Sequence, residues 1–196
     1  MPFYTDPAYQ ADPLAVALGL VNWNYNWAAT SNNSAPTSQT IYAEAIWLPF
    51  GRSITHLSML ISTAAAGTAI TAGYMGLCSP TTMIAQTASI GTASSAYPSG
   101  ALVKSLAGSV TSYVPNPGDS PTGLYYVMLL LNGTFGGTQP TFIRGATNST
   151  GQGASPSGGA NPLSATAGTG QATLPANGAA ITLTTPGYGF VVGCAP

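Results

Sequence analysis

Side chains that could transfer a proton, hold a metal ion or activate a nucleophile are scarce in this chain of 196 residues. They are Asp6, Asp12, Glu44, Arg52, His56, Lys104, Asp119 and Arg144. General acid–base catalysis needs titratable groups in close pairs, and metal sites need clusters of His, Cys or carboxylate ligands. Only 4% of the residues are charged, against roughly a quarter in typical soluble domains. The sequence therefore predicts no catalytic residue, no metal site and no cofactor, and a protein that is not an enzyme.

His56 is the residue from which a catalytic triad would have to be built, together with a serine and either Asp119 or Asp6. No Gly-x-Ser-x-Gly sequence surrounds a serine, and nothing in the sequence places an acid beside His56. On an alternating strand, His56 would share the polar face with Ser58. We interpret it as a solvent-facing or hydrogen-bonded histidine.

Glu44 lies in the middle of a predicted strand. A pair of catalytic carboxylates would require Glu44 and Asp119 to lie only a few ångströms apart. We predict instead a structural ion pair across neighbouring strands, with Arg52, Lys104 or Arg144 as the partner.

The charge balance limits the possible partners. A net charge of −1 excludes strong electrostatic binding of nucleic acid, which needs clustered Lys and Arg. The same shortage argues against docking on an anionic membrane surface, and the apolar run 14–21 is too short to span a bilayer. Few charges also give little self-repulsion, so we expect the surface to contact other protein, including further copies of this chain. The alternative is that Ser, Thr, Asn and Gln side chains keep a monomer hydrated.

Cysteine use and the N-terminal residues bear on the compartment. Residues 1–12 lack the basic region that opens a secretory signal, so the chain is predicted to fold in a cytoplasm, whatever its final location. Cys78 and Cys194 lie far apart, without Cys-x-x-Cys spacing. We favour two buried free thiols, with a disulfide as the alternative.

An aromatic row is the most distinctive pattern in the chain. Trp23, Tyr25 and Trp27 recur at every second residue and alternate with asparagines, so on a strand they would share one face. We favour an anchor that packs into a groove of a neighbouring subunit. The alternatives are packing in the protein's own core and stacking on a sugar, with the Asn amides binding hydroxyls. With the aromatic residues before the row, the candidate partner-binding residues are Phe3, Tyr4, Tyr9, Trp23, Tyr25 and Trp27.

The row belongs to a predicted N-terminal arm, residues 1–36, consisting of a short helix that starts at Asp12-Pro13 and the aromatic strand. The polar stretch 30–38 is expected to separate this arm from a β-sandwich body, residues 37–196. Within the body, residues 146–179 are rich in Gly, Ala and Ser. They are predicted to form either a long loop pinned by its neighbours or a flexible excursion.

The body is predicted to be all-β because short apolar runs alternate with Gly and Pro turns and show no helical periodicity. The run 123–131 is the most apolar and indicates a central strand buried on both faces. The expected fold is a jelly-roll-like β-sandwich with an extended N-terminal arm. The predicted strands cover residues 40–48, 54–61, 69–78, 83–86, 101–106, 123–131, 141–144 and 188–192, and the chain is expected to return to the last of them through residues 181–183.

Four of these segments carry a resemblance to a known family. They are Ile41-Tyr42 through Ile46-Trp47-Leu48-Pro49, Gly73-Tyr74-Met75-Gly76-Leu77, Gly123-Leu124-Tyr125-Tyr126-Val127 and Pro140-Thr141-Phe142-Ile143-Arg144-Gly145. In texture and order, over roughly residues 38–192, the chain resembles virion surface proteins of tailed bacteriophages, notably those of actinobacterial hosts. These are minor tail, head decoration or head fibre proteins. The resemblance implies a structural β module, often trimeric, with no catalytic residues to transfer.

We therefore expect a non-enzymatic component of a tailed-phage virion, most simply a surface-displayed capsid decoration or minor capsid protein. It would be a homotrimer, attached to other virion proteins through residues 1–36. The alternative is a tail-associated receptor-binding module that binds a host-surface glycan. That module would use Trp23, Trp27 or the loop aromatics Tyr97 and Tyr113.

Overall fold

The computed structural model describes residues 20–24, 30–67, 69–135, 137–145, 164–184 and 189–196. Within these residues the chain forms antiparallel strands and one short 3-10 helix, η3 (Ser94–Ala96). The strands are β1 (Asn22–Trp23), β2 (Thr30–Ser34), β3 (Ile41–Trp47), β4 (His56–Thr63), β5 (Ala69–Cys78), β6 (Met83–Thr87), β7 (Gly100–Ala107), β8 (Leu124–Thr134), β9 (Thr141–Gly145), β10 (Ser164–Thr166) and β11 (Val192–Ala195).

Most predicted strands of the body are confirmed, and two local expectations are wrong. The polar stretch after residue 30 is not only a separator, because residues 30–34 form β2 and pair with β9. Residues 181–183 return along the body between single bridges to Thr82 and Thr166. The C-terminal strand begins at Val192, four residues later than expected. The predicted helix after Asp12 lies outside the described residues.

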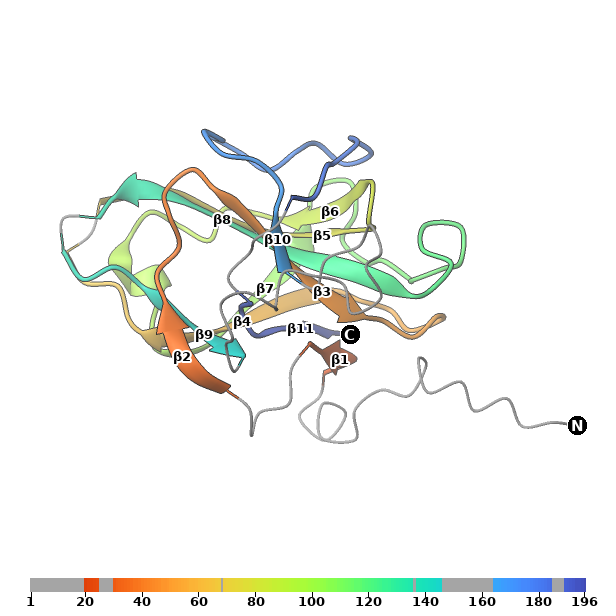
Figure 1. Cartoon of the computed structure of the whole chain (residues 1–196), viewed down its shortest axis with the longest axis horizontal. Helices are drawn as coiled ribbons and strands as arrows, with labels where there is room; N and C mark the ends of the chain where they lie inside the picture. The colour runs from red at the N-terminus through yellow and green to blue at the C-terminus, as the bar shows by residue number, and fades with distance from the viewer. Residues whose placement is uncertain (1–19, 25–29, 68, 136, 146–163, 185–188) are drawn as a thin grey trace, which may run out of the picture.

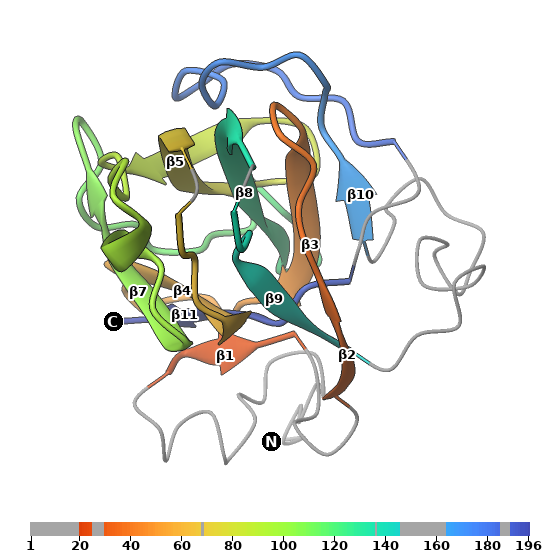
Figure 2. The same cartoon turned by 90° about the vertical axis from the view of Figure 1, so that its left-hand side faces the viewer.

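The strands form one antiparallel sheet that curls into two layers, a jelly-roll-like β-sandwich (Figures 1 and 2). The hydrogen-bonded order is β1-β11-β4-β7-β6-β5-β8-β3-β10, and β9 joins β4 while carrying β2 on its other side. We call β1, β11, β4, β7, β9 and β2 the β4 layer, and β6, β5, β8, β3 and β10 the β8 layer. The layers are joined where β7 pairs with β6, at Ala107–Gln86 and Leu106–Thr87.

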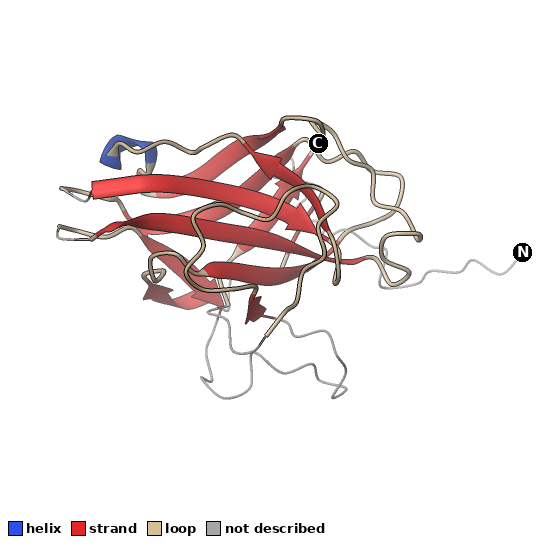
Figure 3. Ribbon diagram, turned by 90° about the horizontal axis from the view of Figure 1, so that it is seen from above, coloured by secondary structure: helices blue, strands red, loops and turns tan. Residues whose placement is uncertain are grey.

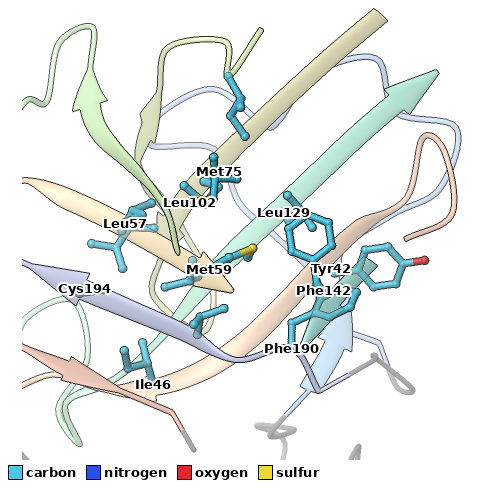
Figure 4. Packing of buried hydrophobic residues seen from close by; sticks show 14 of the residues in the cluster. Tyr42, Ile46, Leu57, Met59, Met75, Leu102, Leu129, Phe142, Phe190 and Cys194 are labelled. Carbon is cyan, nitrogen blue, oxygen red and sulfur yellow. The ribbon is translucent and has the colours of Figure 1, made fainter. Parts of the chain in front are cut away.

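The main core lies between the two layers. On the β4 layer, Met59 pairs in register with Leu102 of β7 and Val192 of β11. On the β8 layer, Leu129 is flanked by Tyr42 of β3 and Met75 of β5. These residues are buried and belong to one hydrophobic cluster, which Figure 4 shows from close by.

Aromatic packing fills one end of this core. The rings of Tyr42 and Phe190 meet edge to face with centroids 5.4 Å apart, and those of Phe142 and Phe190 lie 5.5 Å apart (Figure 4). Such tilted contacts place the positive ring edge against the negative ring face. Phe190 therefore connects the segment before β11 to both layers.

The outer face of the β8 layer is also covered. Residues 167–184, which we call the strap, cross this face (Figures 2 and 3). Leu174 and Ile181 of the strap belong to or pack against the apolar cluster that contains Met128 and Leu130. A Cβ at Gly76 would lie 2.9 Å from Leu174 Cδ1, so the strap packs directly on the backbone of β5. The prediction for the 146–179 segment is thus resolved for its described part, which is a loop pinned by neighbours.

Hydrogen bonds hold the strap at both ends. The Asn132 side chain of β8 donates to the carbonyls of Gln171 and Ala172 at 3.1 and 2.9 Å. At the other end, Met83 of β6 donates its N–H to Ala179 O and accepts from Gly178 N. With the strap in place, residues 124–132 of β8 are all buried, which confirms the prediction of a strand covered on both faces.

Close packing inside the body makes Gly73 a sensitive position. A Cβ there would lie 1.9 Å from the Tyr97 hydroxyl oxygen, and that hydroxyl donates to Gly91 O at 3.0 Å inside the core. Gly73→Ala should lower the free energy of unfolding by about 2–3 kcal/mol, in the range of overpacked cores. Urea unfolding followed by tryptophan fluorescence measures the change.

A double-mutant cycle isolates the cause. In a Tyr97→Phe background the colliding oxygen is absent, so adding Gly73→Ala should cost at least about 1 kcal/mol less than it does in the wild type. Strictly additive effects of the two substitutions would contradict this assignment.

Candidate functional site

The predicted aromatic row is only partly within the described residues. Trp23 lies on β1, where its backbone pairs with Gly193 of β11. Five of the six candidate residues lie outside the described part of the chain: Phe3, Tyr4, Tyr9, Tyr25 and Trp27. The structure therefore does not show whether the aromatics share one face.

Asn22 and Asn24 of the row bond to the body of the protein, whereas Asn26 lies outside the described residues. Asn22 Nδ2 donates to Trp47 O at 2.6 Å. Asn24 Nδ2 donates to Phe190 O at 2.9 Å, and its Oδ1 accepts from Val192 N at 2.8 Å. These amide groups anchor β1 to its neighbours, so they are not the free sugar-binding groups that the glycan interpretation needs.

The loop aromatics proposed for glycan binding are also occupied. Tyr97 is fully buried, and its hydroxyl donates to Gly91 O. Tyr113 donates to Asp119 Oδ2 at 2.6 Å and contacts the Tyr125 hydroxyl at 3.1 Å. Burial, the Asp119 hydrogen bond and the Tyr125 hydrogen bond all raise the pKa of Tyr113. This cluster shapes the 113–125 loop, and the Tyr113 hydroxyl and ring are engaged by Asp119 and Tyr125.

His56 is placed as a hydrogen-bonded, partly exposed residue. Its Nδ1 lies 2.7 Å from Thr55 Oγ1 and 3.2 Å from the backbone oxygen of Pro196. Among the described residues, no carboxylate is hydrogen-bonded to it. Asp119 instead belongs to the Tyr113 cluster, so it does not complete a triad with His56, and Asp6 lies outside the described residues.

Both cysteines are free and fully buried, as favoured from their spacing. Cys78 Sγ lies 3.7 Å from Tyr126 O, and Cys194 lies in the main core. Burial raises the pKa of both thiols. The reactive thiolate is therefore suppressed at both positions.

Glu44 departs most from expectation. It shares the inner face of β3 with Tyr42 and Ile46 and is fully buried in the core. Neither carboxylate oxygen has a partner within standard hydrogen-bond geometry, and of the three predicted ion-pair partners Arg144 is the one whose charge acts on this carboxyl group. Desolvation raises the pKa of Glu44 to about 8. The Ser164 hydroxyl, the amides of Phe190 and Gly189 and the charge of Arg144 oppose this rise only in part.

The register explains this environment. Glu44 faces Val127 on one side and Ser164 of β10 on the other. Ser164 Oγ accepts the Gly189 N–H at 2.8 Å, which ties the segment before β11 to the β10 edge. Glu44 is therefore enclosed in the core as a protonated carboxylic acid at neutral pH. Its role is to pack between strands.

An open groove that the sequence analysis did not identify lies among the described residues. It has a volume of about 830 Å³ and lies on the outer face of the β8 layer beside the strap. Its walls include Tyr74 of β5, Gln86 and Thr87 of β6, and Thr173, Leu174 and Asn177 of the strap. We call it the strap groove. No sequence signal joins these residues, because the strap has neither apolar periodicity nor a motif.

The buried carboxyl group makes stability depend on pH. Between about pH 4.5 and 8 the folded chain keeps the Glu44 proton while the unfolded chain releases it, so the free energy of unfolding should fall as pH rises. The span corresponds to at most about 5 kcal/mol, at roughly 1.4 kcal/mol per pKa unit. Glu44→Gln should flatten this dependence and be relatively most stable at pH 8 and above.

Urea unfolding at several pH values between 4 and 9 tests this expectation. Asp119→Asn is the comparison variant, because it removes a carboxylate that lies in the exposed 113–125 loop and outside the core. An unchanged slope in Glu44→Gln would show that another group carries the pH dependence.

Comparisons with known proteins complete the description of the site. No protein-family model matches the chain, and no curated protein matches it. The described residues contain no group of three or more His, Cys, Asp or Glu side chains placed to hold a metal ion. Within the same residues, no helix has the length and apolar character needed to cross a bilayer. The candidate functional regions are therefore the N-terminal strands β1 and β2 and the strap groove.

Proposed function

We propose that this chain is a non-enzymatic structural protein of a tailed-phage virion. It is a surface-displayed capsid decoration or minor capsid protein, attached through its N-terminal residues as a homotrimer. The observation that carries the proposal is that the titratable side chains of the described residues lie apart from one another. Glu44 is enclosed in the core, His56 binds the C-terminal residue, and Asp119 holds the 113–125 loop. A protein whose reactive groups are separated in this way acts by contact between surfaces.

The body suits this role because it is covered on both sides of its central layer. The main core joins the two layers, and the strap closes the outer face of the β8 layer. Closely packed protein interiors resist deformation. Such a body holds its shape while its surfaces are buried against neighbours.

The N-terminal strands supply the route of attachment. β1 ends the hydrogen-bonded order of the sheet beside β11, and β2 lies on the outer side of β9. Edge strands of this kind offer unpaired backbone groups to a neighbouring chain. The candidate anchors Phe3, Tyr4 and Tyr9 precede β1 in the sequence, and β1 itself is paired with β11 of the β4 layer.

The pairing of β1 and β2 determines where the chain should be truncated. Removal of residues 1–36 would strip β1 from β11 and β2 from β9 and would confound folding with attachment. Removal of residues 1–19 keeps both strands. We expect this shorter deletion to fold with an unchanged unfolding midpoint, to lose self-association in light scattering, and to be missing from purified virions.

Point substitutions provide a second test of the same proposal. Joint replacement of Phe3, Tyr4 and Tyr9 by Ala should reduce incorporation into particles, measured as copy number by quantitative mass spectrometry. Val103→Ala, at a surface residue 47% exposed on β7, is the control and should be incorporated normally. Normal copy number of the 1–19 deletion would overturn attachment through these residues.

A further inference from the structure

The strap groove is an open depression in the surface of the β8 layer. Its volume of about 830 Å³ lies within the range of about 300–1,000 Å³ that is typical of small-molecule pockets. One wall is the outer face of β5 and β6, and the other is the strap, which Asn132 and Met83 hold at its two ends. The groove is therefore built from anchored elements.

An aromatic ring forms part of the β-sheet wall. Tyr74 pairs in register with Leu130 of β8, whose side chain belongs to the outer cluster. The ring is half-buried and packs on that cluster, which fixes its position while part of it faces the groove. Among the described residues, no hydrogen bond engages its hydroxyl group.

Polar groups of the groove are also available. Gln86 of β6 lies in the register row next to Gly76 and Ala107, and its side-chain amide has no hydrogen-bond partner within the described part of the chain. The same holds for the Thr173 hydroxyl on the strap. Asn177 and Ser109 instead bond to each other at 3.2 Å and join the strap to the loop after β7.

The charge of the lining selects the class of ligand. Of the described residues that line the groove, none is Asp, Glu, Lys, Arg or His. Phosphates and carboxylates are recognised by Arg, Lys or clustered N–H donors, and cationic ligands by carboxylates or aromatic cages. A partly exposed ring beside an amide and hydroxyls matches a neutral ligand that has one apolar face and a rim of hydroxyl groups.

We propose that the strap groove binds a neutral sugar, either as a free saccharide or as a unit of a surface glycan. Tyr74 contacts the apolar face of the pyranose ring. The Gln86 amide and the Thr173 hydroxyl bind ring hydroxyls. This site lies on the β8 layer and uses none of the aromatics that the sequence singled out, so it is independent of the attachment through residues 1–19.

The test uses the full chain and two sets of probes. An array of neutral hexose and N-acetylhexosamine oligosaccharides, printed beside sialylated and sulfated versions, measures binding to immobilised glycans. Calorimetric titration with the corresponding free oligosaccharides at millimolar concentration measures binding in solution. The expected result is binding of at least one neutral sugar, with no gain from an added acidic group.

Substitutions then locate the site. Tyr74→Ala should weaken binding at least tenfold, and Tyr74→Phe should weaken it less, because it keeps the ring and its packing. Since Tyr74→Ala also removes a packed side chain, Gln86→Ala and Thr173→Ala provide variants that leave the outer cluster intact, and each should weaken binding severalfold with an unchanged unfolding midpoint. Trp23→Ala and Val103→Ala are the controls and should bind as the wild type does.

Three results would overturn the proposal. They are absence of binding to every neutral sugar in both formats, binding confined to acidic glycans, and binding that is unchanged in Tyr74→Ala, Gln86→Ala and Thr173→Ala, whether or not Trp23→Ala abolishes it. None of these results bears on virion attachment, which is read from the 1–19 deletion.

Discussion

The structure depends on shielding β8 from water on both faces. Residues 124–131 of this strand are apolar throughout and buried, and each large side chain in such a position is worth about 1.5–3 kcal/mol of hydrophobic stabilisation. The β4 layer covers one face, and the other requires a second cover. The strap provides it with Leu174 and Ile181, although its own composition has few large side chains. A weakly apolar segment can serve as this cover because Asn132 and Met83 hold it in place through hydrogen bonds.

Neutral polar side chains connect neighbouring segments in this protein, a role that ion pairs often have in other domains. Asn24 and Asn132 each bond two or more backbone groups of neighbouring segments, and Asn116 organises the 113–125 loop together with Asp119. Burying a neutral amide that is fully hydrogen-bonded avoids the large desolvation cost of burying a charge. Glu44 is the exception. It is tolerated because the core shifts its pKa so that it remains protonated near neutral pH.

The two proposed contact regions lie on different layers of the sandwich. The N-terminal strands belong to the β4 layer, whereas the strap groove opens on the outer face of the β8 layer. A decoration protein attached through the first layer would present the second to its surroundings. In this arrangement the covered β8 layer is both the rigid centre of the body and the support for a ligand site, since Tyr74 and Gln86 project from strands whose other side is packed in the core.

Local patterns in the sequence determined the all-β class, most strand positions, the double burial of β8 and the free state of both cysteines, because apolar runs, alternation and spacing are properties of neighbouring residues. Pairing between distant residues decided the rest. Residues 30–34 carry no apolar alternation and are a strand because β9 offers them an edge. The sequence predicted that Glu44 forms an ion pair, but the strand register encloses it between Val127 and Ser164. The candidate sites differ in the same respect. Trp23 could be selected from the spacing of its neighbours in the sequence. Tyr74 lines a groove because a strap about a hundred residues later in the chain folds back beside it, and no local signal encodes that contact.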